Sequence, residues 1–285
     1  MTAMRIDAHQ HFWVYSREEY GWIDERMDVI RRDFAPSDLR PLLEANGFDG
    51  SVAVQARQHL KETEYLLRVT DEDEDDIVRG VVGWVDLRAA DAEQQLDRFR
   101  SHPRFVGVRH IVQDEPDDRF LMREDFLRGV ALLGDLTYDI LVYPKQLPAT
   151  LELADRFPDH RLVLDHIAKP SVARGELEPW ASQIRTLAEA PNVFCKVSGM
   201  VTEADWKAWK RDELTPYLDV VFEAFGPSRI MVGSDWPVCT LAASYDRVMD
   251  IVSTYIEPLS EGDKTAVFGG TAEKFYKLEA STNAH

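Results

Sequence analysis

Short apolar segments that recur eight times, each followed by a stretch with helical spacing, constrain the fold of this chain more than any other feature. Their Val, Ile and Leu residues run almost without interruption, which is typical of parallel strands buried on both faces. We expect strands near residues 4–9, 50–56, 77–87, 105–112, 139–144, 161–166, 193–198 and 229–235. Eight strand–helix units predict an α/β protein, a single TIM-type (β/α)8 barrel.

The segments between the strands show helical periodicity and helix end signals. In the first helix we expect Ser37 at the N-cap and Gly47 at the end. Further helices are expected over residues 147–157, 178–190 and 204–225. Residues 12–35 form a long first loop, and the acidic run 71–76 is interpreted as a solvated helix end. No compositional break divides the chain, so we expect one domain over residues 1–285.

The charge balance excludes some classes of partner. The 285 residues include 33 Lys and Arg against 51 Asp and Glu, a net charge of −18. Such a field repels phosphates, which argues against nucleic acid and anionic membranes as partners. A hydrophobic fraction of 45% is enough for a large core. The sequence is compatible with an oligomer but does not specify one.

The two cysteines, Cys195 and Cys239, are too few for a disulfide framework. Neither lies in a motif that would make it a nucleophile, and we expect both to serve packing. The sequence has no secretory signal and no apolar run long enough to cross a bilayer. These features predict a cytoplasmic protein.

The chemistry of such a barrel lies at the carboxyl ends of its strands. The first strand ends in His9 and His11, which are one residue apart and therefore point to the same side. The sixth strand ends in His166, and the eighth in Asp235. We expect these four side chains to meet at one mouth of the barrel. Neutral imidazoles and a carboxylate suit a single zinc ion, and imidazoles can also stabilise an oxyanion directly.

Three strand-end segments carry a resemblance to a known family. The segments RIDAHQHFW (5–13), LDHIAKP (164–170) and MVGSDWPV (231–238) resemble the amidohydrolase superfamily. Within it, five further segments resemble the sugar-lactonase branch, and most of all its members that act on L-fuconolactone: residues 52–57, 106–115, 194–199, 200–206 and 237–245. Lactonases for L-rhamnonolactone and 2-pyrone-4,6-dicarboxylate are similar but more distant. The resemblance spans residues 4–277 and implies a hydrolase that opens an aldonolactone, a small-molecule sugar lactone, to the aldonic acid.

The chain departs from the binuclear pattern of that superfamily. The fourth strand has Arg109 and His110 where a bridging Lys or Glu is usual, and the fifth offers Tyr143 and no His. A bridged two-metal site therefore lacks its ligands. At most one zinc ion is expected, on His9, His11, His166 and Asp235, and the resemblance implies that activity does not strictly require it.

A mechanism follows as a hypothesis for the same four residues. Asp235 would take a proton from water and later return it to the ring oxygen. The side chains of His9, His11 and His166, or one zinc ion among them, would stabilise charge on the carbonyl oxygen.

A second group of residues is expected to contact the sugar. These candidates are polar residues in apolar strands or aromatic residues near the site: Arg109, His110, Lys196, Gln55, Tyr143, Trp236 and, as a lesser candidate, Lys169. The alternative for Arg109 is a pair with a carboxylate in the core, and for Gln55, Tyr143, Lys196 and Lys169 it is a salt bridge at the barrel rim. Trp22 and Trp84 could also offer a face to a sugar, but only Trp236 adjoins Asp235.

Two other functions remain open at this point. One is a zinc-dependent decarboxylase or amide hydrolase of the same superfamily, and the other is a non-catalytic barrel that binds a sugar acid. The sequence lacks the GxSxG, GxxxxGK[ST] and GxGxxG motifs of serine esterases, phosphate loops and dinucleotide sites.

Overall fold

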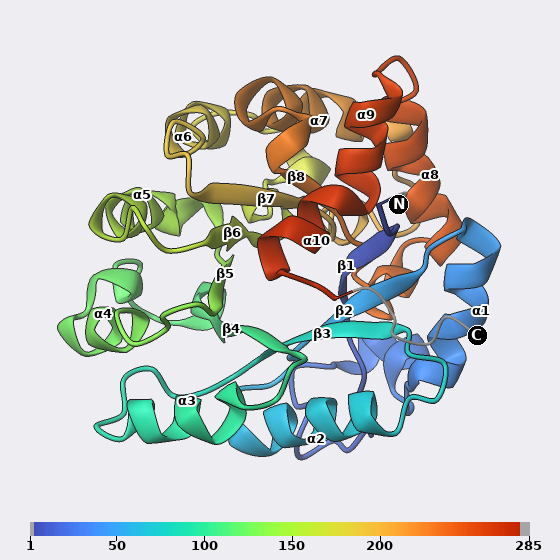
Figure 1. Cartoon of the computed structure of the whole chain (residues 1–285). Helices are drawn as coiled ribbons and strands as arrows, with labels where there is room; N and C mark the ends of the chain where they lie inside the picture. Colours follow the sequence, from blue (N-terminus) through green and yellow to red (C-terminus); the bar gives the residue numbers. More distant parts are fainter. Residues whose placement is uncertain (1–2, 280–285) are drawn as a thin grey trace.

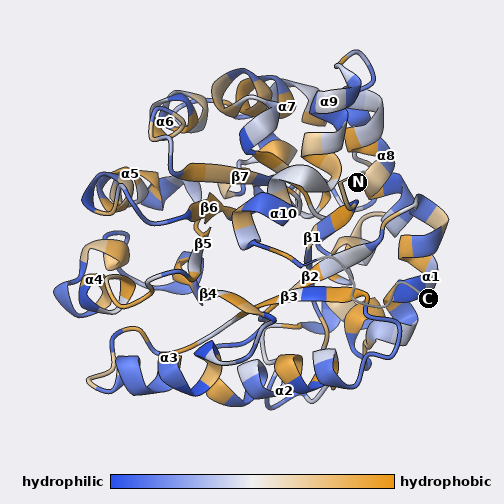
Figure 2. Cartoon of the chain, in the orientation of Figure 1, coloured by the Kyte–Doolittle hydropathy of each residue, from blue (hydrophilic) through white to orange (hydrophobic). Residues whose placement is uncertain are grey.

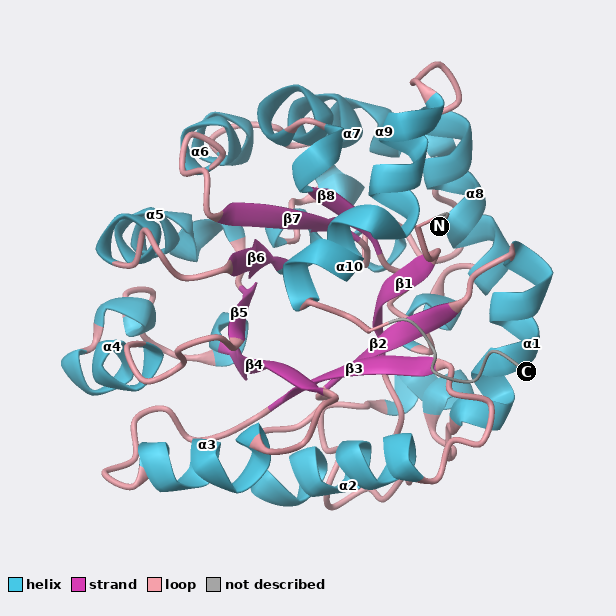
Figure 3. Ribbon diagram, in the orientation of Figure 1, coloured by secondary structure: helices cyan, strands magenta, loops and turns pink. Residues whose placement is uncertain are grey.

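Eight parallel strands form a ring in the computed structural model, which describes residues 3–279. The strands are β1 (Ile6–Gln10), β2 (Gly50–Val54), β3 (Val78–Gly83), β4 (Phe105–Ile111), β5 (Thr137–Leu141), β6 (Leu162–Leu164), β7 (Val193–Val197) and β8 (Ile230–Val232). Each strand pairs with the next one along the chain, from β1 to β8. Figure 3 shows this ring inside a layer of helices. The predicted (β/α)8 barrel is confirmed.

The ring closes between β8 and β1 through the residues of the predicted site. The amide of His11 donates to the carbonyl of Trp236 at 2.7 Å, and the amide of Asp235 donates to the carbonyl of His9 at 2.8 Å. A single parallel bridge joins Gln10 to Trp236. These closing contacts hold the end of β1 directly against the segment that carries Asp235.

The helices form the outer layer of the barrel. They are α1 (Pro36–Asn46), α2 (Leu60–Asp71), α3 (Ala92–Arg100), α4 (Glu124–Val130), α5 (Leu147–Arg156), α6 (Trp180–Leu187), α7 (Arg211–Phe225) and α8 (Tyr245–Tyr255). Figure 2 shows that they carry both hydrophilic and hydrophobic residues, whereas β4, β6 and β7 are mainly hydrophobic. The helices therefore bury one face against the strands and expose the other. Over residues 3–279 no helix combines the length and apolar character needed to cross a bilayer.

Several helix boundaries differ from the sequence predictions, and α6 (Trp180–Leu187) is shorter at both ends than the expected 178–190. Helix α1 stops at the expected Gly47, its C-cap, which has φ at +68°, but it begins at Pro36, and Ala35 is its N-cap. The carboxylate of Asp38 accepts the Ala35 amide at 3.0 Å, which takes the place of the cap expected at Ser37. Residues 204–210, expected to be helical, precede α7 as turns.

The amino end of the barrel is closed by the C-terminal segment. After α9 (Glu261–Thr265), the short helix α10 (Thr271–Tyr276) lies in front of the strand ring in Figure 1. The hydroxyl of Tyr276 enters the ring and donates to Asp139 Oδ2 at 2.8 Å. The backbone at Gly269 passes so close to β1 that a Cβ atom there would lie 1.8 Å from the Met4 carbonyl oxygen. The site at the opposite end of the barrel therefore stands above a closed interior.

Candidate active site

A cavity of about 380 Å³ opens at the carboxyl end of the barrel. Three of the four predicted catalytic residues, His11, His166 and Asp235, line it directly, together with Arg109. His9 lies just below them and is fully buried. The ends of β1, β4, β6 and β8 supply these side chains, as expected for a barrel site.

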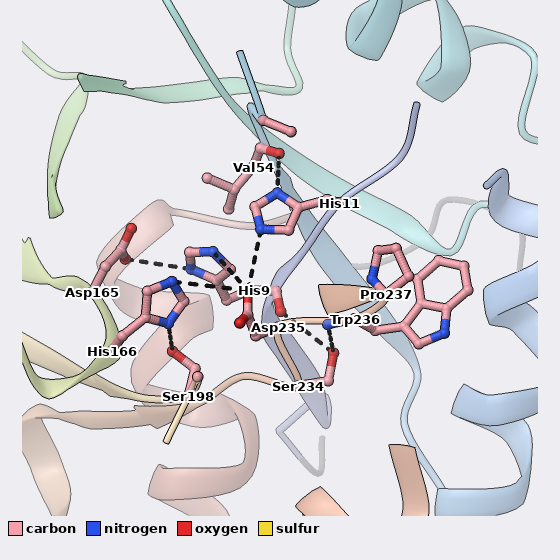
Figure 4. A network of polar contacts seen from close by, with 12 residues as sticks. His9, His11, Val54, Asp165, His166, Ser198, Ser234, Asp235, Trp236 and Pro237 are labelled. Carbon is pink, nitrogen blue, oxygen red and sulfur yellow. Dashed lines mark hydrogen bonds and ion pairs between the residues drawn. The ribbon is translucent and has the colours of Figure 1, made fainter. Parts of the chain in front are cut away.

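The carboxylate of Asp235 lies at the centre of a cluster of three imidazoles (Figure 4). Its Oδ1 atom is 3.3 Å from Nε2 of His11, 3.8 Å from Nε2 of His166 and 4.0 Å from Nε2 of His9. The rings of His9 and His166 are 4.4 Å apart between centroids. Each of the three rings thus directs its Nε2 atom toward Oδ1 of Asp235.

The hydrogen bonds behind the rings show what this arrangement can hold. Nδ1 of His11 lies 2.7 Å from the carbonyl oxygen of Val54, which can only accept, so Nδ1 carries a proton. In a neutral ring, Nε2 of His11 then presents a lone pair to an oxygen of Asp235. Two acceptors facing each other at 3.3 Å require a proton or a cation between them. The described residues therefore fit a cation site made by His9, His11 and Asp235, with His166 beside it.

The charge states of these groups follow from burial and from one another. Burial lowers the pKa of His166 to about 4 and holds the pKa of His9 well below its usual value, so both rings are neutral near pH 7. Burial acts to raise the pKa of Asp235, but its interactions with His166, His11 and Lys169 outweigh burial and lower that pKa. Asp235 is therefore an ionised carboxylate beside the neutral imidazoles of His9 and His166.

The backbone around the cluster adopts conformations that side chains rarely tolerate. The φ of Asp235 is +58°, and the four residues from His166 to Lys169 have φ between +49° and +61°. At Gly233 a Cβ atom would lie 2.6 Å from Cβ of His9, so glycine allows β8 to approach β1 this closely. Strained backbone of this kind concentrates at functional sites.

An ion-pair network lies beneath the imidazoles. Asp165 Oδ2 accepts from Arg109 at 3.0 Å, and its Oδ1 is 3.1 Å from Nζ of Lys196. Nζ of Lys196 also contacts Asp139, the residue that Tyr276 reaches from below. Asp165, His9 and His166 lie close enough together to share a metal ion. The Asp165 carboxylate, however, is already neutralised by Arg109 and Lys196. This network could have been inferred from the sequence, because Asp139 and Asp165 are charged residues within apolar strand segments. No role was predicted for either residue.

Two predicted sugar contacts, Lys196 and Gln55, lie below the cavity and do not line it. Lys196 was expected to contact the sugar, and the structure contradicts this, because the side chain is completely buried among Asp139, Asp165 and His9. Gln55 is also buried, and its Nε2 atom donates to the carbonyl of Arg109 at 3.1 Å. Carboxylates inside the barrel supplied the partners that the sequence could not reveal.

Two further predicted contacts point away from the cavity. His110 faces the helix layer, where it stacks on Phe120 with centroids 4.7 Å apart and bonds Glu115 at 2.7 Å. Adjacent residues of a strand face opposite sides, so Arg109 and His110 could not both enter the barrel. Trp236 is 3% exposed and packs edge-on against Phe12 and Phe34, in a direction away from the imidazoles (Figure 4).

The rest of the cavity wall combines residues predicted from the sequence with residues that were not predicted. Tyr143 and Lys169, both weighed from the sequence, are part of the wall. Trp22, from the long first loop, is 38% exposed and offers the aromatic face that had been assigned to Trp236. The wall also includes residues that sequence reasoning missed, chiefly Met27, Glu203, Trp206 and Leu241. The cysteines Cys195 and Cys239 are buried and do not line it.

The fold and this His–Asp site define the class of protein. The sequence profile of the family described as Amidohydrolase matches residues 6–278, and the chain belongs to that family. It is 43% identical to an L-fucono-1,5-lactonase of Burkholderia multivorans, over 100% of this chain and 99% of the relative. An L-fucono-1,5-lactonase of Burkholderia ambifaria is 39% identical, over 96% of each chain.

A solved structure is similar over the same length. The crystal structure of an amidohydrolase from Burkholderia multivorans with bound zinc superimposes with a TM-score of 0.94 at 43% identity, over 97% of this chain and 100% of the other. Together with the curated relatives, this similarity supports a hydrolase of sugar lactones, which are cyclic esters. It does not favour the decarboxylase, the amide hydrolase or the non-catalytic binding barrel.

Proposed function

We propose that this protein hydrolyses L-fucono-1,5-lactone, or an aldonolactone closely related to it, to the aldonic acid. The observation that carries the proposal is the position of Asp235, whose ionised carboxylate meets three imidazole nitrogens at the floor of an open cavity. The names of the relatives at 43% and 39% identity support the choice of substrate.

Asp235 acts on the attacking water in this proposal. Its carboxylate accepts a proton from water as the water oxygen adds to the lactone carbonyl carbon. The bond from that carbon to the ring oxygen then breaks, and the proton held on Asp235 passes to the ring oxygen. One water is consumed, and the product is an open-chain hydroxy acid.

The groups around Asp235 stabilise the negative charge that develops on the carbonyl oxygen. Arg109 lies in the cavity wall with Nη1 3.2 Å from Nε2 of His9, and it provides a permanent cation next to the cluster. His9, His11 and Asp235, with His166 beside them, would hold one zinc ion, which when bound would polarise the carbonyl and lower the pKa of water. Because a cyclic ester is an activated substrate and Arg109 is already present, we propose that turnover does not strictly require the metal.

A lactone screen with a pH indicator tests the reaction. Wild-type protein should release acid from L-fucono-1,5-lactone above the spontaneous rate, and Asp235→Asn should lower kcat by about 10²–10⁴-fold. Asp135→Asn is the matched control, because Asp135 is exposed and pairs with Lys277 far from the cavity. Failure of the wild type to open any aldonolactone would contradict the proposal, as would an active Asp235→Asn variant.

Metal removal tests the cofactor separately. Elemental analysis should find no more than one zinc ion per chain, and His11→Asn should lower that content. Chelator-treated protein should keep measurable lactonase activity. Complete loss of turnover that zinc alone restores would overturn the metal-optional part of the proposal and leave the lactonase assignment intact.

The biological setting is part of the same proposal. We place the enzyme in the cytoplasm and in carbohydrate catabolism, with residues 1–285 acting as one domain. The two unpaired buried thiols of Cys195 and Cys239 are compatible with a reducing compartment. Detection of the protein in the cytoplasmic fraction, and its induction by the parent sugar, would test this placement.

A further inference from the structure

The wall of the cavity contains an ion pair that the proposed mechanism does not use. Lys169 ends the turn that follows β6, and Glu203 ends a short 3-10 turn after β7 (Val201–Glu203). Both line the same cavity as Asp235, and Nζ of Lys169 is 3.5 Å from Oε1 of Glu203. Their side chains are 17% and 20% exposed, so the pair is reachable from the cavity but largely shielded from bulk water.

The carboxylate of Glu203 has room for further donors. Lys169 is the one cation that pairs with it among residues 3–279, at a distance longer than a strong charge-assisted hydrogen bond. Burial raises the pKa of Glu203, and Lys169 opposes that shift. A shielded carboxylate with acceptor sites still free gains from hydroxyl donors brought in by a ligand.

The ammonium of Lys169 has two neighbours that hold it. Its Nζ atom lies 5.7 Å from the centroid of the Tyr143 ring and 3.5 Å from Oε1 of Glu203. Its backbone belongs to the left-handed run that begins at His166. The position of Lys169 is therefore fixed relative to His166 and the reacting centre. A salt bridge that only stabilised the barrel rim would not need its lysine to be positioned in this way.

We propose that Lys169 and Glu203 together bind two neighbouring hydroxyl groups of the sugar lactone and so select among lactones that differ in hydroxyl configuration. The inference rests on the proposed function. One hydroxyl donates to the Glu203 carboxylate, and its neighbour accepts from the Lys169 ammonium. A lactone with a hydroxyl in the wrong configuration leaves one of these charges unsatisfied, and sites built to bond a hydroxyl discriminate strongly against such substrates.

The apolar part of the cavity supports this orientation. Trp22, Met27, Val238 and Leu241 line the cavity and offer no charged group to hydroxyls. A sugar ring has a polar and a less polar side, so a cavity that offers both apolar side chains and an ion pair favours a pose with the hydroxyls toward the pair.

The experiment compares two substrates that share the reaction but differ in hydroxyl groups. L-fucono-1,5-lactone and δ-valerolactone, which has no ring hydroxyl, are assayed with wild type, Glu203→Gln and Lys169→Met. The ratio of kcat/KM for the sugar lactone to kcat/KM for δ-valerolactone should fall by about 10- to 100-fold in each variant. Asp118→Asn is the control, because it breaks an exposed lysine pair with Lys145 and should leave the ratio unchanged.

Each outcome decides the inference. An unchanged ratio in both variants would show an ordinary salt bridge and overturn it, as would an equal loss on both substrates. If Glu203→Gln does not fold, Glu203→Asp keeps the charge, shortens the reach and should lower the same ratio. Wild-type protein that opens no sugar lactone would overturn the proposed function, and this result is visible before any variant is measured.

Discussion

Gly199 lies so close to His166 that a Cβ atom at position 199 would be 2.5 Å from Nδ1 of the imidazole. The same ring nitrogen is 2.8 Å from the hydroxyl of Ser198. The end of β7 therefore sets the position of a ring contributed by β6, and glycine is what permits the contact.

Replacement of this glycine should damage activity more than stability. Gly199→Ala has to place a side chain at φ +61°, which costs about 1–2 kcal/mol, and it also displaces His166. We expect kcat to fall by about 10- to 100-fold. Gly175→Ala is the matched control, because Gly175 has φ +65° and no atom within 4 Å of the added carbon. It should lose similar stability in a denaturant titration and keep its activity; a parallel loss of kcat in both variants would contradict the prediction.

The stability of chelator-treated protein should fall in mild acid because of His166. The folded protein keeps this ring neutral until its pKa of about 4, whereas the unfolded chain takes up the proton near pH 6.5. The contribution of His166 to stability is therefore present above pH 6.5 and is lost as the pH falls toward 4. The loss amounts to about 2 kcal/mol between pH 7 and pH 5. Urea unfolding at both values should show a smaller acid loss in His166→Asn, and equal losses would count against this explanation.

Removal of the buried ammonium of Lys196 should destabilise the barrel. Lys196→Met leaves Asp139 and Asp165 as buried carboxylates without their shared cation, which costs about 3–5 kcal/mol. The double variant Lys196→Met/Asp139→Asn should recover part of this loss in thermal unfolding. Glu152→Gln, which breaks the exposed pair with Arg119, should leave Tm nearly unchanged. A stable Lys196→Met variant would show that the network does not support the fold.

Two tryptophans should separate substrate binding from folding. Trp22 lines the cavity, and Trp22→Ala should raise KM for the sugar lactone by about tenfold with little change in Tm. Trp236 is packed between Phe12 and Phe34, and Trp236→Ala should cost about 3–5 kcal/mol of stability. Steady-state kinetics and thermal unfolding of both variants test the pair. The reverse pattern would restore the role first expected for Trp236.

Much of the architecture could be predicted from local sequence patterns. Buried parallel strands need apolar residues on both faces, and that requirement is visible in most strands of the chain, with β1 (IDAHQ) as the exception. The spacing of His9 and His11 also determines that both rings face the same side of β1. Because all strands of a barrel end at one mouth, the meeting of His9, His11, His166 and Asp235 follows from the strand positions alone.

The roles of single polar residues could not be predicted in the same way. Lys196 and Arg109 each interrupt an apolar strand, yet one is sealed beneath the site and the other reaches the cavity. The difference depends on carboxylates from other strands, Asp139 and Asp165, whose distances no local pattern contains. Trp22 and Trp236 show the same limit, because the loop that carries Trp22 is placed by tertiary packing.

The sequence by itself thus determined the barrel and which histidines and aspartate gather at its mouth, because strand periodicity and strand order act locally. Only the tertiary structure decided which cations remain free to meet a substrate. A buried charge needs a partner within a few ångströms, and in this chain the partners come from positions tens of residues away, such as Lys196 with Asp139 and Lys169 with Glu203.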